Sequence, residues 1–179
     1  MAGETCEHID GLTVSPAGGF ELSQIWAWLD QVLDPEVPAL SVVDLGVIRQ
    51  VEWRCGRLLV QVTPTYSGCP ATRAIEQALV AHLQTKGVVD VCIERVLAPA
   101  WSSDWITARG RERLLEYGIV PPVHAGPGRF PWSRAKPAIG CPQCAAPSPE
   151  LVSEFGSTAC KAQYRCRACK EPFEYFKCI

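Results

Sequence analysis

The chain has 179 residues, of which 47% are apolar and 20% charged, and this length suits one ordinary domain plus a small accessory module. Its 17 Lys and Arg residues nearly balance 19 Asp and Glu residues, so no global basic field favours nucleic acid or an anionic membrane as a partner. The first residues lack the basic start and long apolar stretch of a signal peptide, and no run approaches a transmembrane span. We therefore expect a cytoplasmic protein with no membrane partner.

Ten cysteines are the unusual feature of this composition. Thiols stay reduced in the cytoplasm, so these cysteines indicate metal or cluster ligands ahead of a disulfide framework.

The first elements follow a tail, residues 1–21, that contains few large apolar residues and that we expect to be flexible. Apolar residues at helical spacing from Leu22 to Leu33 then predict an amphipathic helix, which Pro35 ends. Two apolar runs, 47–53 and 58–64, flank the turn residues 54–57, and this arrangement predicts a β-hairpin.

The next elements are a helix, a strand and a helix. Pro70 opens a helical pattern that Gly87 ends, residues 88–97 alternate like a strand, and a helix over 107–117 ends at Gly118. A strand–helix–strand crossover makes its two strands parallel. The sequence therefore predicts an α+β domain over residues 22–120, with the order α-β-β-α-β-α and a small mixed three-stranded sheet.

A Pro- and Gly-rich linker is predicted over residues 121–140, and a cysteine-rich module follows over 141–179. The module contains two CxxC pairs separated by 21 residues. Such pairs bring four sulfurs to one tetrahedral Zn²⁺ ion, so we expect a zinc ribbon with strands near 151–155, 162–165 and 173–177. The predicted metal ligands are Cys141, Cys144, Cys166 and Cys169.

The closed Cys₄ set favours a structural zinc site over a redox or nucleic-acid role, because it leaves no open coordination position. Rubredoxin-like iron is the minor alternative. Two further cysteines, Cys160 and Cys178, fall outside this set. Strand pairing outward from Ala168 would place them opposite each other, as a dithiol that could hold a soft metal ion or form a disulfide. Two unrelated buried cysteines are an equally good interpretation.

Cys69 precedes Pro70 at the predicted start of the second helix. At a helix N-cap, the helix dipole and free amide groups favour the thiolate, which both nucleophiles and soft-metal ligands require. The alternative is that Cys69 is only a cap. Asp34 and Asp44 have simple structural interpretations as well, a helix stop and a turn.

Several short motifs together resemble the SufT-like metal–sulfur cluster biosynthesis domain over residues 22–120. They are Asp34-Pro35-Glu36, Asp44-Leu45-Gly46, Thr63-Pro64-Thr65, Gly68-Cys69-Pro70 and Pro99-Ala100-Trp101. With the ribbon and the stretches 153–162 and 171–178, the chain resembles the PaaD-type proteins of bacterial phenylacetate degradation. The resemblance implies a role in assembling iron–sulfur or related metal centres, with Cys69 as the functional cysteine and Asp34, Glu36, Asp44 and Thr65 as supporting residues.

The resemblance also implies partners. PaaD-type proteins accompany the multicomponent oxygenase that epoxidises phenylacetyl-CoA, and they are not counted in its catalytic core. The implied client is the reductase component with its [2Fe–2S] cluster, or else the diiron oxygenase subunits.

A lone Cys69 cannot fill the four thiolate positions of a cluster. A transient iron–sulfur cluster or iron ion would therefore be shared with a second protomer of a homodimer, with Cys160 and Cys178, or with the client. The first hypothesis is a non-catalytic maturation factor. The alternatives are a thiol–disulfide oxidoreductase that acts on a client and an accessory subunit of the oxygenase complex.

Overall fold

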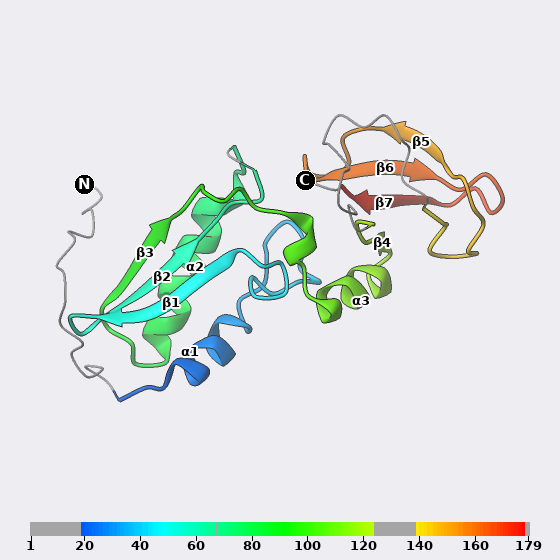
Figure 1. The fold of residues 1–179 in the computed structure, drawn as a ribbon. Coiled ribbons are helices and arrows are strands. Elements are labelled where there is room, and N and C mark those ends of the chain that lie inside the picture. Colours follow the sequence, from blue (N-terminus) through cyan, green and yellow to red (C-terminus); the bar gives the residue numbers. More distant parts are fainter. Residues whose placement is uncertain (1–18, 67, 124–138, 178–179) are drawn as a thin grey trace.

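The computed structural model describes residues 19–66, 68–123 and 139–177. The expectations for the first 18 residues, for linker residues 124–138 and for Cys178 lie outside this part of the chain. Figure 1 shows two β-sheets, one from each half of the chain, with helix α3 (Ala108–Glu116) between them.

The first sheet is the predicted mixed sheet. It contains β1 (Ile48–Arg54), β2 (Arg57–Val62) and β3 (Val91–Arg95) in the order β1-β2-β3. Strands β1 and β2 are antiparallel, whereas β2 and β3 are parallel and are joined through α2 (Ala71–Thr85). The α+β class and the strand directions expected from the sequence are confirmed.

The hairpin turn between β1 and β2 has two residues. Arg54 pairs with Arg57, and the intervening Cys55 and Gly56 have φ values of 49° and 79°. Positive φ at both central residues is the type I′ geometry, whose twist matches that of the flanking strands. Gly56 adopts this conformation without strain, and Cys55 occupies the left-handed region that non-glycine residues seldom adopt.

Helix α1 spans Leu22–Leu29 and ends earlier than the apolar pattern through Leu33 suggests. The backbone beyond it pairs instead with a later segment: Val32 accepts a hydrogen bond from Val42, and Asp34 donates one to Leu40. Leu33 is consequently exposed rather than on a buried helix face. Local periodicity could not reveal this pairing, because it depends on residues six to ten positions away.

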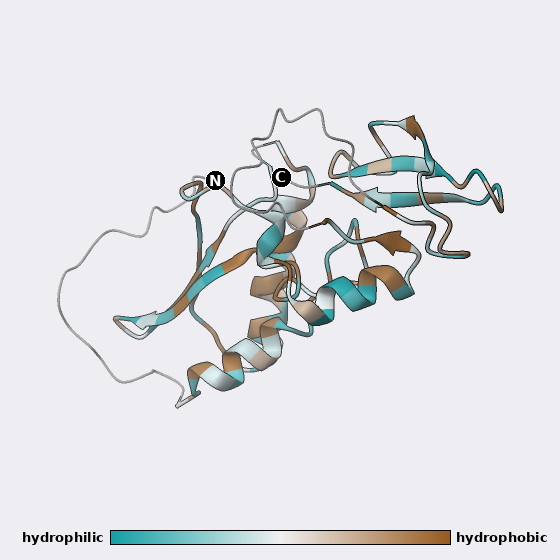
Figure 2. Cartoon of the chain, turned by 45° about the vertical axis from the view of Figure 1, so that its right-hand side comes forward, coloured by the Kyte–Doolittle hydropathy of each residue, from teal (hydrophilic) through white to brown (hydrophobic). Residues whose placement is uncertain are grey.

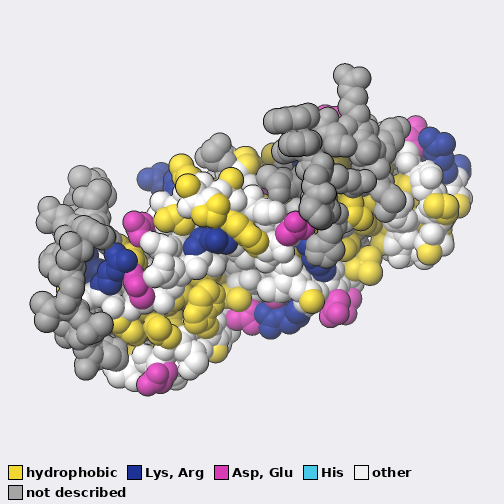
Figure 3. Space-filling model, viewed as in Figure 1, with side chains coloured by type: hydrophobic (Ala, Val, Ile, Leu, Met, Phe, Trp, Pro, Cys, Tyr) yellow, Lys and Arg dark blue, Asp and Glu magenta, His cyan; other side chains and the backbone are white. Residues whose placement is uncertain are grey.

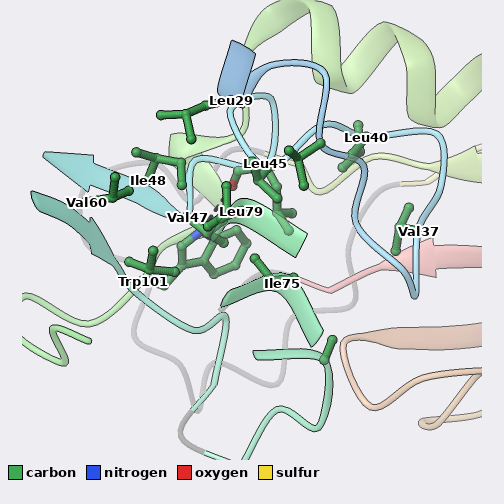
Figure 4. Close-up of a cluster of buried hydrophobic side chains, with 14 of the residues drawn as sticks. Leu29, Val37, Leu40, Leu45, Val47, Ile48, Val60, Ile75, Leu79 and Trp101 are labelled. Atoms are coloured by element: carbon green, nitrogen blue, oxygen red, sulfur yellow. Dashed lines mark hydrogen bonds between the residues drawn. The ribbon is translucent and has the colours of Figure 1, made fainter. Parts of the chain in front are cut away.

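The main hydrophobic core lies between the first sheet and the helices. Its fully buried members include Leu29 of α1, Val60 of β2 and Leu79 of α2, which Figure 4 shows close together around Trp101. The Trp101 indole N–H donates to the carbonyl oxygen of Leu45 at 3.1 Å, so the buried ring has its polar atom satisfied. Polar and apolar segments alternate along the helices in Figure 2, as amphipathic packing requires.

Helix α3 begins and ends as the sequence predicts. Thr107 caps its start, accepting a hydrogen bond from the Gly110 N–H at 2.9 Å, and Gly118 follows its end with a φ of 87°. A short 3₁₀ helix, η1 (Ser103–Trp105), precedes it.

The second sheet contains β4 (Ile119–Val120), β5 (Glu150–Ser153), β6 (Lys161–Arg165) and β7 (Pro172–Phe176), in the order β4-β7-β6-β5. The β5, β6 and β7 strands form the antiparallel ribbon, and β4 pairs with β7 in parallel. Because β4 directly follows α3, the N-terminal half contributes a strand to the ribbon sheet. None of the helices in the described ranges is long and apolar enough to span a lipid bilayer.

Candidate functional site

Four cysteine sulfurs converge at one end of the ribbon. The Sγ atoms of Cys141, Cys144, Cys166 and Cys169 all lie within 4.8 Å of one another. The Cys141–Cys169 and Cys144–Cys166 sulfur pairs are each 3.6 Å apart. Within the described ranges, no other group of three or more His, Cys, Asp or Glu residues has its ligand atoms this close together.

The two CxxC turns have the same backbone geometry. The Cys141 carbonyl accepts from the Ala145 N–H at 2.9 Å, and the Cys166 carbonyl accepts from the Lys170 N–H at 3.1 Å. Ala145 and Lys170 have φ values of 58° and 67°, so each turn closes through a left-handed residue that is not glycine. This matched pair of turns points all four sulfurs at one centre.

The four-sulfur group fits a zinc ion. A tetrahedral shell with Zn–S bonds of about 2.3 Å places its sulfurs about 3.8 Å apart, close to the two separations of 3.6 Å. Zinc would take all four sulfurs and leave no position for a substrate, which suits a structural site. A module of this size buries little apolar surface, and the ion would supply much of its folding energy.

A second group of chemically active residues lines a pocket where the two halves of the molecule meet. The N-terminal half contributes Asp34, Glu36, Thr65 and Cys69, and the ribbon contributes Cys160 and Phe176. The structure thus brings together five of the residues that the sequence singled out.

Cys69 reaches this pocket from the loop between β2 and α2. Its N–H donates to the Tyr66 carbonyl at 3.0 Å, and its own carbonyl accepts from the Thr72 N–H at 3.3 Å. Pro70 is the N-cap of α2, so Cys69 lies one residue before the N-cap position that the sequence predicted for it. The difference is small, because Pro70 itself has helical dihedrals, φ −68° and ψ −26°, and the first turn of the helix therefore already includes it.

Asp34 lies at the floor of a tight turn and is only 5% exposed. Its Oδ1 atom accepts hydrogen bonds from the Glu36 and Val37 N–H groups at 2.8 and 2.7 Å. Burial raises the pKa of Asp34, although the two backbone hydrogen bonds and the Lys161 charge oppose that shift. Glu36 follows in the same turn, and its pKa is raised by burial and by the neighbouring Asp34 charge.

Cys160 is the residue immediately before β6. It lines the pocket and is buried. The Thr158 hydroxyl lies 3.0 Å from its sulfur. Burial raises the pKa of Cys160, as do the charges of Glu36 and Asp34. The adjoining Lys161 is buried too, with its Nζ atom 2.9 Å from the Glu174 carboxylate.

Sequence reasoning missed two residues of this pocket region, Tyr66 and Phe176. Burial raises the pKa of Tyr66, and the charges of Cys69, Glu36 and Cys160 add to the shift, so Tyr66 lies near these acids and thiols. Tyr66 lies between the motifs Thr63-Pro64-Thr65 and Gly68-Cys69-Pro70, and this position could have drawn attention to it. Phe176 contacts Trp101, with ring centroids 6.1 Å apart, and no local pattern predicts that contact.

Asp44 lies outside the pocket lining. It is fully buried and accepts hydrogen bonds from Thr107 at 2.7 Å, Arg109 at 2.8 Å and Arg113 at 2.9 Å. Burial alone would raise the pKa of Asp44, but the hydrogen bonds from Arg109 and Thr107 outweigh it and hold that pKa below its ordinary value. Asp44 therefore anchors α3 to the loop that precedes β1.

The predicted pairing of Cys160 with Cys178 falls outside the described residues and stays a prediction. The register near it is defined: Lys161 pairs with Phe176, and the Lys177 N–H donates to the Cys160 carbonyl at 2.9 Å.

Comparison with known proteins places both halves of the chain. Residues 22–93 match the family described as "Iron-sulfur cluster assembly protein", and residues 128–177 match the "PaaD zinc beta ribbon domain". The chain is 46% identical over 167 residues to an Escherichia coli (strain K12) protein, across 93% of this chain and 97% of the relative. The name of that relative begins "Putative 1,2-phenylacetyl-CoA epoxidase" and assigns it to the enzyme as a subunit. The chain belongs to the PaaD family.

In this PaaD-family chain, the N-terminal pocket residues through Cys69 lie in the assembly-protein match, while Cys160 and the four-cysteine group lie in the ribbon match. Two solved structures resemble about half of the chain. A domain of unknown function from Bacillus anthracis (DUF59) gives a TM-score of 0.48 at 25% identity, covering 51% of this chain and 89% of that one. Rv1466 from Mycobacterium tuberculosis, described as associated with [Fe-S] complex assembly and repair, gives 0.34 at 34% identity, covering 54% and 85%.

Proposed function

We propose that this protein is a non-catalytic assembly factor for the metal centres of phenylacetyl-CoA epoxidase. In this role the Cys69 thiolate binds an iron–sulfur component as transient cargo and passes it to the enzyme. The observation that carries the proposal is the position of Cys69 in a partly buried pocket of the half that matches iron–sulfur cluster assembly proteins. The name of the 46% identical relative suggests the receiving enzyme.

The two sulfur sites of the protein suit different tasks. The ribbon's four cysteines form a closed set, which favours permanent retention of a metal ion. The Cys69 pocket offers too few thiolates to complete the ligation of a cluster, and incomplete ligation favours release. Cargo would therefore move through the Cys69 pocket while the zinc ion maintains the fold beside it.

The reductase component of the epoxidase, with its [2Fe–2S] cluster, is the proposed client, because a cluster needs both iron and sulfide delivered to preformed cysteines. The diiron oxygenase subunits are the alternative client. A homodimer with two Cys69 thiolates facing each other would be one way to share cargo before delivery. The roughly balanced scatter of acidic and basic side chains on the face in Figure 3 offers no single-sign field for nucleic acid.

The test is genetic and chemical. Cells whose only copy of the protein carries Cys69→Ala should fail to grow on phenylacetate, and the reductase purified from them should lack iron and acid-labile sulfide. Cys55→Ala is the matched control, because Cys55 is an exposed thiol in the β1–β2 turn. Normal growth and a fully loaded reductase in the Cys69→Ala strain would overturn the proposal.

A second candidate role is that of a permanent component of the epoxidase complex. The name of the relative, which counts it among the subunits of that enzyme, favours this role. Purification of the mature complex separates the two roles, because an assembly factor leaves after loading. A stoichiometric amount of this protein in the active complex would support permanent membership.

A further inference from the structure

We propose that the pocket formed by Asp34, Glu36, Cys69 and Cys160 binds a single divalent transition-metal ion, iron(II) in the cell, with Cys160 of the ribbon as its second thiolate ligand. This inference deepens the proposed function, since it names the cargo that the Cys69 site takes. It also assigns a role to the ribbon that a structural zinc site alone does not have.

The pocket carries both sulfur and oxygen donors. Cys69 and Cys160 reach it from opposite halves of the molecule, and Asp34 and Glu36 come from the turn after α1. Within the described residues, both hydrogen bonds to the buried Asp34 carboxylate go to Oδ1, which leaves Oδ2 available to a ligand. Thiolates favour Zn²⁺ and iron, and carboxylates favour harder ions, so a mixed set suits intermediate ions such as Fe²⁺, Co²⁺ and Zn²⁺.

The charges around the pocket favour a cation. Two carboxylates and two thiols face a partly buried space, and the nearby buried cation, Lys161, forms an ion pair with Glu174 at 2.9 Å. Ionising these acids and thiols in a buried space is costly unless positive charge is added. A divalent ion would supply that charge.

The size of the pocket favours one ion over a preformed cluster. It has room for about one water-sized group, whereas a [2Fe–2S] unit contains four heavy atoms. No three of its donor atoms lie within 4.8 Å of one another. The donors would therefore close around the ion by rotation of Cys69 and Glu36, the two that are less buried.

The experiment uses the full-length protein with its ribbon already loaded with zinc, titrated anaerobically with Co²⁺. We expect one Co²⁺ to bind per chain, with sulfur-to-cobalt charge-transfer absorption from two thiolates. Cys160→Ser should weaken Co²⁺ binding at least about tenfold and halve that absorption, and Cys69→Ser should do the same. Asp34→Asn should weaken binding while leaving the thiolate absorption per bound ion unchanged. Cys55→Ser should match the wild type.

Two further measurements keep the test decisive. Retention of one zinc per chain and an unchanged thermal midpoint show that Cys160→Ser is folded, and if it is not, Cys160→Ala and Asp34→Asn carry the test. Failure of the wild type to bind Co²⁺, or equal binding by Cys160→Ser, would overturn the inference. If maturation still depends on Cys69 in that event, the proposed function stands and the cargo is not a single ion held by Cys160.

Discussion

Cys160 and Cys166 stand at the two ends of strand β6: Cys160 immediately precedes Lys161, and Cys166 immediately follows Arg165. One residue lines the Cys69 pocket and the other belongs to the four-cysteine group. Six residues of extended chain span about 20 Å, so a single strand joins two separate sulfur sites. Metal binding at the Cys166 end of β6 should therefore keep the strand folded. The pocket at its Cys160 end should depend on that metal.

Loss of zinc should therefore change the reactivity of the Cys69 thiol. Cys141→Ser removes one ligand, and we expect loss of bound zinc and rapid proteolysis of the ribbon, because the module has little apolar core of its own. Cys69 should then react faster with iodoacetamide, since Cys160 and Phe176 no longer cover it. Zinc analysis and mass-spectrometric rates at each cysteine are the measurements, with Cys55 as the internal standard. An unchanged Cys69 rate after zinc loss would contradict the coupling.

Phe176→Ala should separate docking of the ribbon from zinc binding. Phe176 is 1% exposed and belongs to the same buried cluster as the N-terminal core, so its loss should lower the free energy of unfolding by about 3–5 kcal/mol. Zinc content should stay at one ion per chain, because no ligand changes. Phe155→Ala is the matched control, since Phe155 is 67% exposed and its removal should cost little. Denaturant melts read at the tryptophans measure both variants.

The raised pKa of Asp34 predicts how the free energy of unfolding changes with pH. Burial raises this pKa above the ordinary value of 3.8, so the fold holds the proton more tightly than the unfolded chain does. Stability contributed by protonated Asp34 is fully present below pH 3.8 and declines as the pH rises through the raised pKa. Asp34→Asn keeps the Oδ1 acceptor without the charge, so its stability relative to wild type should increase as the pH rises. Denaturant unfolding across that range tests the sign, and a relative loss would contradict it.

Asp44 should show the opposite pH dependence. Its pKa is lowered, so its ionised form stabilises the fold above pH 3.8, and that contribution is lost as the pH falls through the lowered pKa. Asp44→Asn should lower the free energy of unfolding at neutral pH by about 2 kcal/mol, since the hydrogen bonds from Arg109 and Arg113 lose their charged acceptor. The difference between wild type and variant should shrink in acid. The Co²⁺ affinity of Asp44→Asn should equal that of wild type, because Asp44 does not line the pocket.

Local patterns were enough for much of the fold. Alternation, turn residues and helix-ending glycines predicted the mixed sheet, the hairpin at Gly56 and the α3 helix that Gly118 follows. These features depend on residues within a few positions of one another, where φ preference and apolar spacing dominate. The four-cysteine group was predictable for the same reason, because each CxxC turn is a local structure. The early end of α1 was not, since long-range backbone pairing causes it.

The sequence by itself determined which residues are the candidates for the chemistry: the four ribbon cysteines, Cys69 and the acids before it. Only the tertiary structure decided which of them lie close together. It placed Cys160 and Phe176 against the N-terminal half, added Tyr66 to the pocket region, and turned Asp44 away to anchor α3. The physical reason is that the shared pocket of Cys69 and Cys160 arises from burial of apolar surface between two packed halves, which leaves no periodic signal along the chain.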